Sequence, residues 1–158
     1  MTLDGDVAQL ARTPPFSLLP REAVQLVAFS CGKRRLATGE ILFAPGETGE
    51  EGWFVLSGAI ELLDRERGAS RRVGQGALIG QGALYAPAPH WVEARALEDS
   101  VLMRVPRETF RRVLTEFPAA ASQIRADLAR RARTLVERLD ATRAASLDPG
   151  APRARAAQ

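Results

Sequence analysis

Residues 76–96 read GALIGQGALYAPAPHWVEARA, with glycines at positions 76, 80 and 82 followed by the short apolar run Ala83–Leu84–Tyr85. This order predicts a strand that turns sharply into a few helical residues and ends in a proline-bounded loop. A turn of this kind can leave backbone N–H groups facing an anion. The stretch therefore predicts either a small anion site or a tight turn without a ligand.

The sequence on both sides of this stretch alternates short β-rich runs with glycine. Between Gly32 and Val105 the runs are KRRLA, EILFA, GWFVLSG, AIELLDR, SRRVG, ALIG, WVEARAL and VLMRVP. Runs of this length are too short to be stable alone, and turn residues separate them. Together they predict a closed antiparallel jelly roll.

Helical patterns flank the β section. Residues 14–29 have apolar side chains at helical spacing and predict a short N-terminal helix, and residues 107–117 predict a second helix that Pro118 ends. A longer helix is expected over about 119–145. We therefore expect an α+β fold, an antiparallel β jelly roll (double-stranded β-helix) with an N-terminal helical segment and two C-terminal helices.

The expected domains follow from these patterns. Residues 14–118 form the jelly-roll domain, residues 119–146 a C-terminal dimerisation helix, and residues 147–158, which are rich in Pro, Gly, Ala and Arg, a disordered tail. The long helix carries an apolar stripe, which is either the seam of a homodimer or a face packed back on the barrel. The stripe consists of Ile124, Leu128, Ala132, Leu135 and Leu139.

Length and composition favour one compact domain. The chain has 158 residues, 46% of them hydrophobic, which is enough for a single core. No run approaches the roughly 20 apolar residues that a membrane span needs, and the N-terminus lacks the order of a secretion signal. We expect a cytoplasmic protein with no membrane partner.

The residues suited to catalysis or metal binding are few. Cys31 is the only cysteine and His90 the only histidine, which excludes an intrachain disulfide and a Cys/His zinc cluster. The carboxylates form no recognisable acid/base pair, and the glycines do not match a nucleotide triphosphate loop. We therefore expect a non-enzyme with no catalytic residue, no metal and no cofactor.

The glycine spacing carries a resemblance to a known family. Residues 36–63, LATGEILFAPGETGEEGWFVLSGAIELL, place glycines at tight turns, and residues 76–96 follow them. This pattern resembles cyclic nucleotide-binding domains, the sensor modules of catabolite-activator-like regulators, cyclic-nucleotide-dependent kinases and gated channels. The resemblance covers roughly Phe16 to Asp140 and implies the jelly-roll fold and a role in signal transduction.

The resemblance also implies a ligand site. In ligand-binding members a Phe/Ile-Gly-Glu triplet supplies a Glu for the ribose hydroxyl, and an Arg pairs with the cyclic phosphate; here these positions hold Gln81 and His90. Trp91 stands where the family prefers a small residue, and the position that contacts the base in some members falls near Leu135. The expected ligand-binding residues are therefore Gly80, Gln81, Gly82, Ala83, His90, Trp91 and Leu135.

Two main functions remain open. The first is a cyclic nucleotide-binding-like sensor with a degenerate cassette, which binds a cyclic nucleotide weakly, or a different small anion or ligand, and signals through its C-terminal helix to an unknown protein partner. The alternative is a ligand-independent dimerisation or scaffold module of the same fold. A DNA-binding regulator is the weakest hypothesis, because only about a dozen residues follow the long helix and a helix-turn-helix needs more; we expect no nucleic acid partner.

Overall fold

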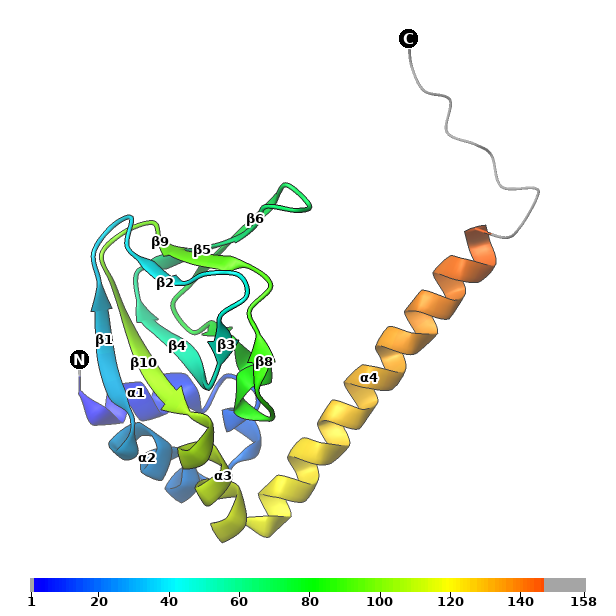
Figure 1. Ribbon diagram of the computed structural model, residues 1–158. Coiled ribbons are helices and arrows are strands. Elements are labelled where there is room, and N and C mark those ends of the chain that lie inside the picture. The colour runs from blue at the N-terminus through cyan, green and yellow to red at the C-terminus, as the bar shows by residue number, and fades with distance from the viewer. Residues whose placement is uncertain (1, 147–158) are drawn as a thin grey trace. The chain divides into compact units, whose positions relative to one another are not determined.

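The computed structural model describes residues 2–146 (Figure 1). Three short helices come first, namely α1 (Leu3–Leu10), the 3-10 helix η1 (Phe16–Leu18) and α2 (Arg21–Ser30). Two α-helices come last among the described residues, α3 (Arg107–Glu116) and α4 (Pro118–Ser146). Between them lie the 3-10 helix η2 (Gln81–Leu84) and the strands β1 (Gly32–Leu36), β2 (Ile41–Phe43), β3 (Thr48–Gly49), β4 (Glu51–Ser57), β5 (Ala59–Asp64), β6 (Ala69–Gly74), β7 (Leu78–Ile79), β8 (Ala88–Pro89), β9 (Glu93–Ala96) and β10 (Ser100–Pro106).

The strands form two four-stranded antiparallel sheets and one small pair. One sheet has the order β1-β10-β4-β7 and the other β2-β9-β5-β6, while β3 pairs with β8. Neighbours in the sheets come from distant parts of the chain, as in a jelly roll, and helices precede and follow them. The expected α+β jelly roll with flanking helices is confirmed.

The core lies between the two large sheets. It is filled by apolar side chains from the strands of both sheets, and β4 is buried at every position from Gly52 to Leu56. The largest buried members of this cluster are Leu36, Leu42, Phe43, Trp53, Ile60, Ile79 and Leu102.

Aromatic side chains tie the helices to the sandwich. Phe16 of η1 meets Phe54 of β4 edge to face at 6.4 Å and Phe110 of α3 at 6.0 Å between ring centroids. Tyr85, directly after η2, meets the same Phe110 at 5.9 Å. Such edge-to-face pairs contribute about 0.5–1.5 kcal/mol each beyond the burial of their area. They hold η2 and α3 in fixed positions within this part of the molecule.

Two features were not expected from the sequence. The N-terminal segment forms α1, capped by the Thr2 hydroxyl, which accepts a hydrogen bond from the N–H of Gly5. The β3–β8 pair was missed because two-residue strands carry no periodicity that a sequence pattern can reveal. The predicted tail, 147–158, lies outside the described residues.

The chain divides into two compact units, one ending at Ala121 and the other beginning at Ser122. The boundary lies inside α4, a few residues after the expected one at Pro118. Among the described residues no helix is long and apolar enough to cross a membrane.

Candidate functional site

The turn at Gly80 leads from β7 into η2. Gly80 adopts a left-handed conformation, with φ of +69°, which an L-residue with a side chain rarely adopts. The N–H of Ala83 donates to the carbonyl of Gly80 at 3.0 Å, and the N–H groups of Tyr85 and Ala86 both donate to Gly82. The turn therefore uses the Ala83 N–H internally, whereas the sequence had suggested that it could face an anion.

His90 follows the β3–β8 pair and is held by its backbone. Its N–H donates to the carbonyl of Glu47 at 2.8 Å, and its own carbonyl accepts from the N–H of Gly46 at 2.8 Å. The imidazole stacks on the ring of Phe43 in β2, with centroids 3.6 Å apart and planes 8° from parallel. The side chain of His90 is thus fixed against the sandwich.

Glycines make room for this imidazole on its other side. A Cβ at Gly49 would lie 3.0 Å from Cε1 and 3.1 Å from Nε2 of His90, and a Cβ at Gly80 would lie 3.4 Å from Cε1. A side chain at Gly49 would push against the ring, whereas a Cβ at Gly80 would be in ordinary contact with it. Gly49 and Phe43 therefore belong to the site, although no sequence signal connected them to His90, because the contact depends on how distant strands pair.

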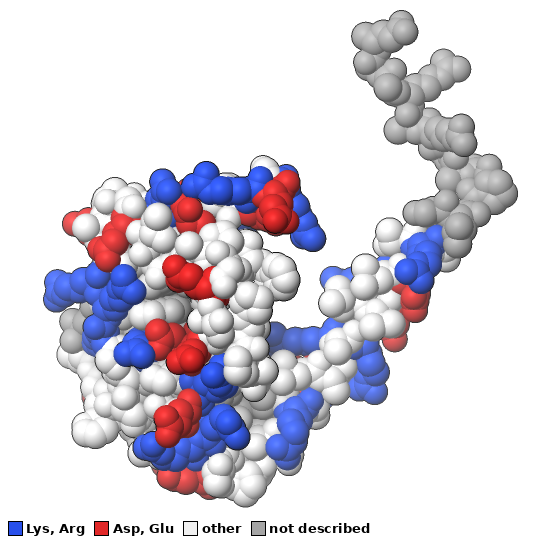
Figure 2. Space-filling model, viewed as in Figure 1, with Lys and Arg blue, Asp and Glu red and all other residues white. Residues whose placement is uncertain are grey.

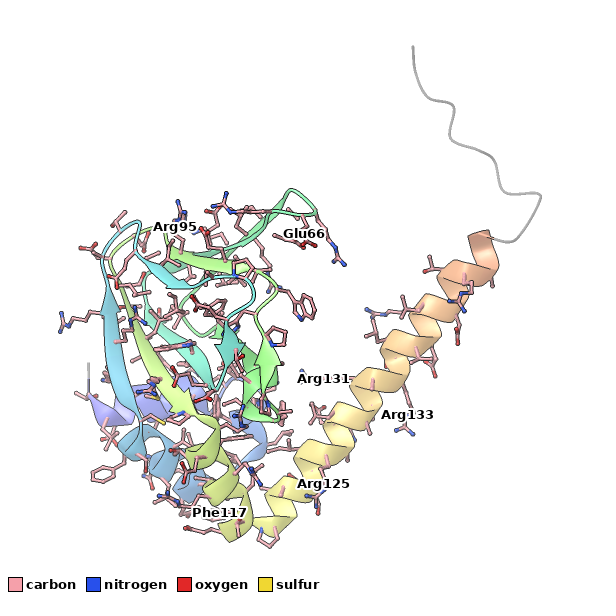
Figure 3. All side chains as sticks on the ribbon, viewed as in Figure 1. Glu66, Arg95, Phe117, Arg125, Arg131 and Arg133 are labelled. Carbon is pink, nitrogen blue, oxygen red and sulfur yellow. The ribbon has the colours of Figure 1, made fainter. Side chains whose placement is uncertain are left out.

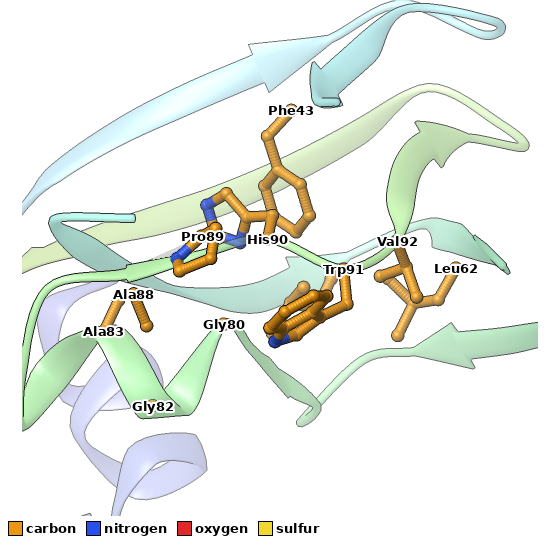
Figure 4. A pocket seen from close by; sticks show the side chains of 11 residues that line it. Phe43, Leu62, Gly80, Gly82, Ala83, Ala88, Pro89, His90, Trp91 and Val92 are labelled. Atoms are coloured by element: carbon orange, nitrogen blue, oxygen red, sulfur yellow. The ribbon is translucent and has the colours of Figure 1, made fainter. Parts of the chain in front are cut away.

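A cavity of about 260 Å³ lies beside the Gly80 turn (Figure 4). His90 is the one titratable side chain among its lining residues, and most of the others are apolar. The lining residues are Phe43, Leu62, Ile79, Gly80, Gly82, Ala83, Ala88, Pro89, His90, Trp91 and Val92.

The cavity brings together five of the seven expected ligand-binding residues: Gly80, Gly82, Ala83, His90 and Trp91. Gln81 is half-buried in η2 but is not one of the lining residues. Leu135 lies on α4 in the second compact unit, with 59% of its surface exposed.

Trp91 lines the cavity without filling it. Its side chain is 80% exposed, and Figure 4 shows the indole near Val92 and Leu62 at one side of the cavity. The sequence had suggested that the indole partly fills the pocket. The structure instead leaves most of the ring surface available to a ligand or to solvent.

The charge balance around His90 favours the neutral imidazole. Burial lowers the pKa of His90 below its ordinary value, and the carboxylates of Glu47 and Glu51 oppose this shift. Because burial is the larger effect, the ring carries little positive charge at pH 7.

The nearby arginines already pair with carboxylates. Arg104 donates to Glu51 across a polar hollow that His90 also borders. Arg95 donates to Glu93 at 2.7 Å and is not among the residues that line the cavity. An anion in the cavity would therefore have to displace Glu51 to bind the guanidinium of Arg104, or Glu93 to bind that of Arg95.

Arg107 connects the Gly80 turn to α3. Its guanidinium Nη1 donates to the carbonyl of Ala83 at 3.1 Å and to that of Gly49 at 3.3 Å, while its N–H donates to Glu50 at 2.9 Å. The first residue of α3 thus holds η2 and β3 together. Sequence analysis gave Arg107 no role, since a surface-type Arg after Pro106 carries no distinguishing pattern.

No group of three or more His, Cys, Asp or Glu side chains able to hold a metal ion occurs in the described part of the chain.

Comparisons with known proteins agree with this geometry. The model for the cyclic nucleotide-binding domain matches residues 33–117, more than half of the chain. The cyclic AMP receptor protein of Thermus thermophilus is 30% identical over 132 residues, which cover 81% of this chain and 61% of that protein. Lysophospholipase nte1 of Aspergillus terreus is 26% identical over 126 residues, which cover 77% of this chain but 8% of that protein.

A solved structure shares the fold. The N-terminal domain of a transcriptional regulator from Streptomyces coelicolor superposes with a TM-score of 0.72 at 27% identity, covering 80% of this chain and 94% of that one. The chain thus spans less than two thirds of the curated relatives described above but nearly all of an isolated regulator domain.

Proposed function

The chain belongs to the cyclic nucleotide-binding domain family, and from this premise we propose that it is a regulatory sensor module with a degenerate cassette. It binds cyclic nucleotide weakly, or accepts a different small ligand, and signals through its C-terminal helix. The observation that carries this proposal is the composition of the cavity, in which the one titratable lining side chain is an imidazole with a lowered pKa.

Weak binding follows from the replacement at His90. An arginine can donate two parallel hydrogen bonds to a phosphate and keeps its charge when water leaves, whereas a neutral imidazole offers one donor or acceptor in the same direction. Losing one charge-assisted hydrogen bond costs about 1.5–3 kcal/mol, or about one to two decades of affinity.

The replacement at Gln81 fits the same proposal. A pocket that lost only its arginine would retain an unbalanced carboxylate, which is costly in a partly buried site. With glutamine at this position the turn stays neutral, so no carboxylate is left without a cation.

Signalling would use the contacts that connect the cavity to the C-terminal helices. Arg107 joins η2 and β3 to the start of α3, and Tyr85 joins the end of η2 to the middle of α3. A ligand that moves the Gly80 turn would therefore move α3, and with it the junction at Pro118 where α4 begins.

A titration with an engineered cassette tests this proposal. Binding of cyclic AMP and cyclic GMP is measured by calorimetry for the wild type and for the double variant Gln81→Glu with His90→Arg. We expect the double variant to bind at least one decade more tightly, because it regains the phosphate fork and its balancing carboxylate. His90→Arg alone is the control and should gain less. Sub-micromolar binding by the wild type, or no gain in the double variant, would refute the degenerate cassette.

The runner-up is a ligand-independent dimerisation module, which the exposure of Leu135, Val136 and Leu139 on α4 favours. Both functions are non-catalytic and place the protein in the cytoplasm as a homodimer. In the lysophospholipase relative the matched region is a small part of a far longer protein, which supports an accessory role for this domain.

A further inference from the structure

The cavity beside the Gly80 turn has the chemistry of an apolar ligand site. Phe43, Leu62, Ile79 and Val92 contribute hydrocarbon, and alanine, proline and glycine supply most of the remainder. An anion transferred into such a lining loses hydration without gaining a cation, and that loss is costly. An uncharged, largely apolar molecule gains the free energy of removing its surface from water.

His90 supplies one hydrogen-bonding position in this lining. Its ring stacks on Phe43 and packs closely against Gly49, which restricts its rotation. Within the described residues no hydrogen bond uses the ring nitrogens of His90, which leaves them available to one polar group of a ligand. Ligand sites commonly pair an apolar lining with one or a few fixed polar groups that orient the ligand.

Trp91 supplies a flat surface at the side of the cavity. Its indole is 80% exposed and lies near Val92 and Leu62 (Figure 4). An aromatic ligand could pack against this exposed ring surface in the offset or edge-to-face geometry that aromatic pairs prefer.

From these three features we propose that the cavity binds a neutral, planar aromatic molecule with one hydrogen-bonding group. The body of the ligand lies against Trp91 and the aliphatic lining, and its polar group bonds to the imidazole of His90. This inference rests on the proposed function, in that the cavity is taken as the ligand site of a sensor, and it names the ligand class that the sensor prefers.

Matched pairs of probes test the role of charge. 2-Naphthol and 2-naphthoate, and likewise indole and indole-3-carboxylate, share a ring system but differ in charge at pH 7.5. Calorimetry with the wild-type protein should give dissociation constants for the neutral probes at least tenfold below those of the matched carboxylates. Equal or tighter binding of the carboxylates, or no binding of either neutral probe, would overturn the proposal.

Three variants test the position of the ligand. Trp91→Ala should weaken 2-naphthol binding about three- to tenfold, because the contact with the indole ring is lost. His90→Phe keeps the stacking on Phe43 but removes the ring nitrogens, so it should weaken 2-naphthol binding by a similar factor. Phe29→Ala is the matched control, because Phe29 is also 80% exposed but lies on α2 away from the cavity lining. Unchanged binding in Trp91→Ala, or an equal loss in Phe29→Ala, would place the probe elsewhere and refute the proposed site.

The 2-naphthol experiment and the cyclic nucleotide titration can fail independently of each other. If Gln81→Glu with His90→Arg gains cyclic nucleotide affinity while 2-naphthol fails to bind the wild type, the sensor proposal stands and the neutral aromatic ligand is wrong. If 2-naphthol binds as expected while the double variant gains nothing, the degenerate cassette is refuted and the cavity remains the binding site of a neutral aromatic molecule.

Discussion

His90 is the residue on which the ligand chemistry depends, and its charge can be measured directly. Because it is the only histidine, one imidazole signal will report its titration by NMR. Burial lowers its pKa, so the midpoint should fall below the ordinary value of about 6.5. A midpoint at or above that value would show that Glu47 and Glu51 dominate over burial.

The lowered pKa of His90 also makes the free energy of unfolding depend on pH. When the pKa of a histidine is lower in the folded state than in the unfolded state, the unfolded state binds the proton first. The free energy of unfolding is therefore at its full value above the unfolded pKa of about 6.5 and decreases as the pH falls below it toward the folded pKa. The free energy of unfolding should therefore decrease from pH 7 to pH 5 more steeply in the wild type than in His90→Asn. Urea denaturation at several pH values measures both slopes.

Gly49 shows how closely the site is packed. A methyl group there would lie 3.0 Å from the Cβ of Ala83 and 3.0 Å from the His90 ring, so Gly49→Ala should destabilise the fold by about 1–3 kcal/mol and displace the imidazole. Gly32→Ala is the control, because no atom lies within 4 Å of a Cβ at that strand position. Urea denaturation compares the two variants, and equal stabilities would show that the site tolerates the methyl group.

The sequence pointed to Gly80, Gly82 and His90, which line one cavity in the structure, but not to their surroundings. The turn residues are found from local spacing, since a glycine with positive φ leaves a signature in the chain. The stacking of His90 on Phe43 joins residues 47 positions apart, and the Gly49 contact depends on β3 pairing with β8. Such contacts follow from strand pairing, which no local pattern specifies.

At the scale of elements, Arg107 is the connection between the cavity and α3. Removing its side chain leaves the carbonyls of Ala83 and Gly49 without their charged donor, so Arg107→Ala should cost about 1.5–3 kcal/mol of stability and speed amide hydrogen exchange in η2. Arg111→Ala on the same helix is the matched control, since Arg111 is exposed. Unchanged exchange of the Tyr85 and Ala86 amides in Arg107→Ala would show that η2 does not depend on α3.

The elements themselves were largely predictable. Each of the eight β-rich runs corresponds to a strand of one of the two four-stranded sheets, because glycines at tight turns separate most of the runs. Helix α1 was not predicted, although its side chains Val7 and Leu10 are buried. The end of α3 and the start of α4 follow from Pro118, which is compatible with the first turn of a helix but not with the interior.

At the scale of the whole molecule, many of the charged side chains in the described residues pair with one another. Figure 2 shows basic and acidic side chains interleaved over the hairpin of β5 and β6, where Arg65 pairs with Glu93 and Arg72 with Glu98. Along α4, Arg130 and Arg131 both pair with Asp127, while Figure 3 shows Arg125 and Arg133 on the same helix. Paired charges of this kind contribute little to stability and release few counterions from a polyanion.

The apolar stripe of α4 leads to a prediction about assembly. Ile124 is buried and Leu128 half-buried, but Leu135 and Leu139 are about 60% exposed. Leucines at this spacing on a long helix gain stability when a second helix covers them, so we expect a homodimer through α4 in sedimentation at about 50 µM. Leu128→Glu with Leu135→Glu should give monomers, because charges in the seam would lose hydration on pairing.

Two further variants separate loss of assembly from loss of folding. Leu135→Glu with Leu139→Glu changes only exposed positions, so circular dichroism should show an intact fold while sedimentation shows a monomer. Ala126→Glu with Ala141→Glu adds the same charge on the opposite side of the helix, at 3.6 residues per turn, and should remain dimeric. A wild-type monomer at this concentration would remove α4 as a dimer seam, and the signalling route would then have to end on a different partner.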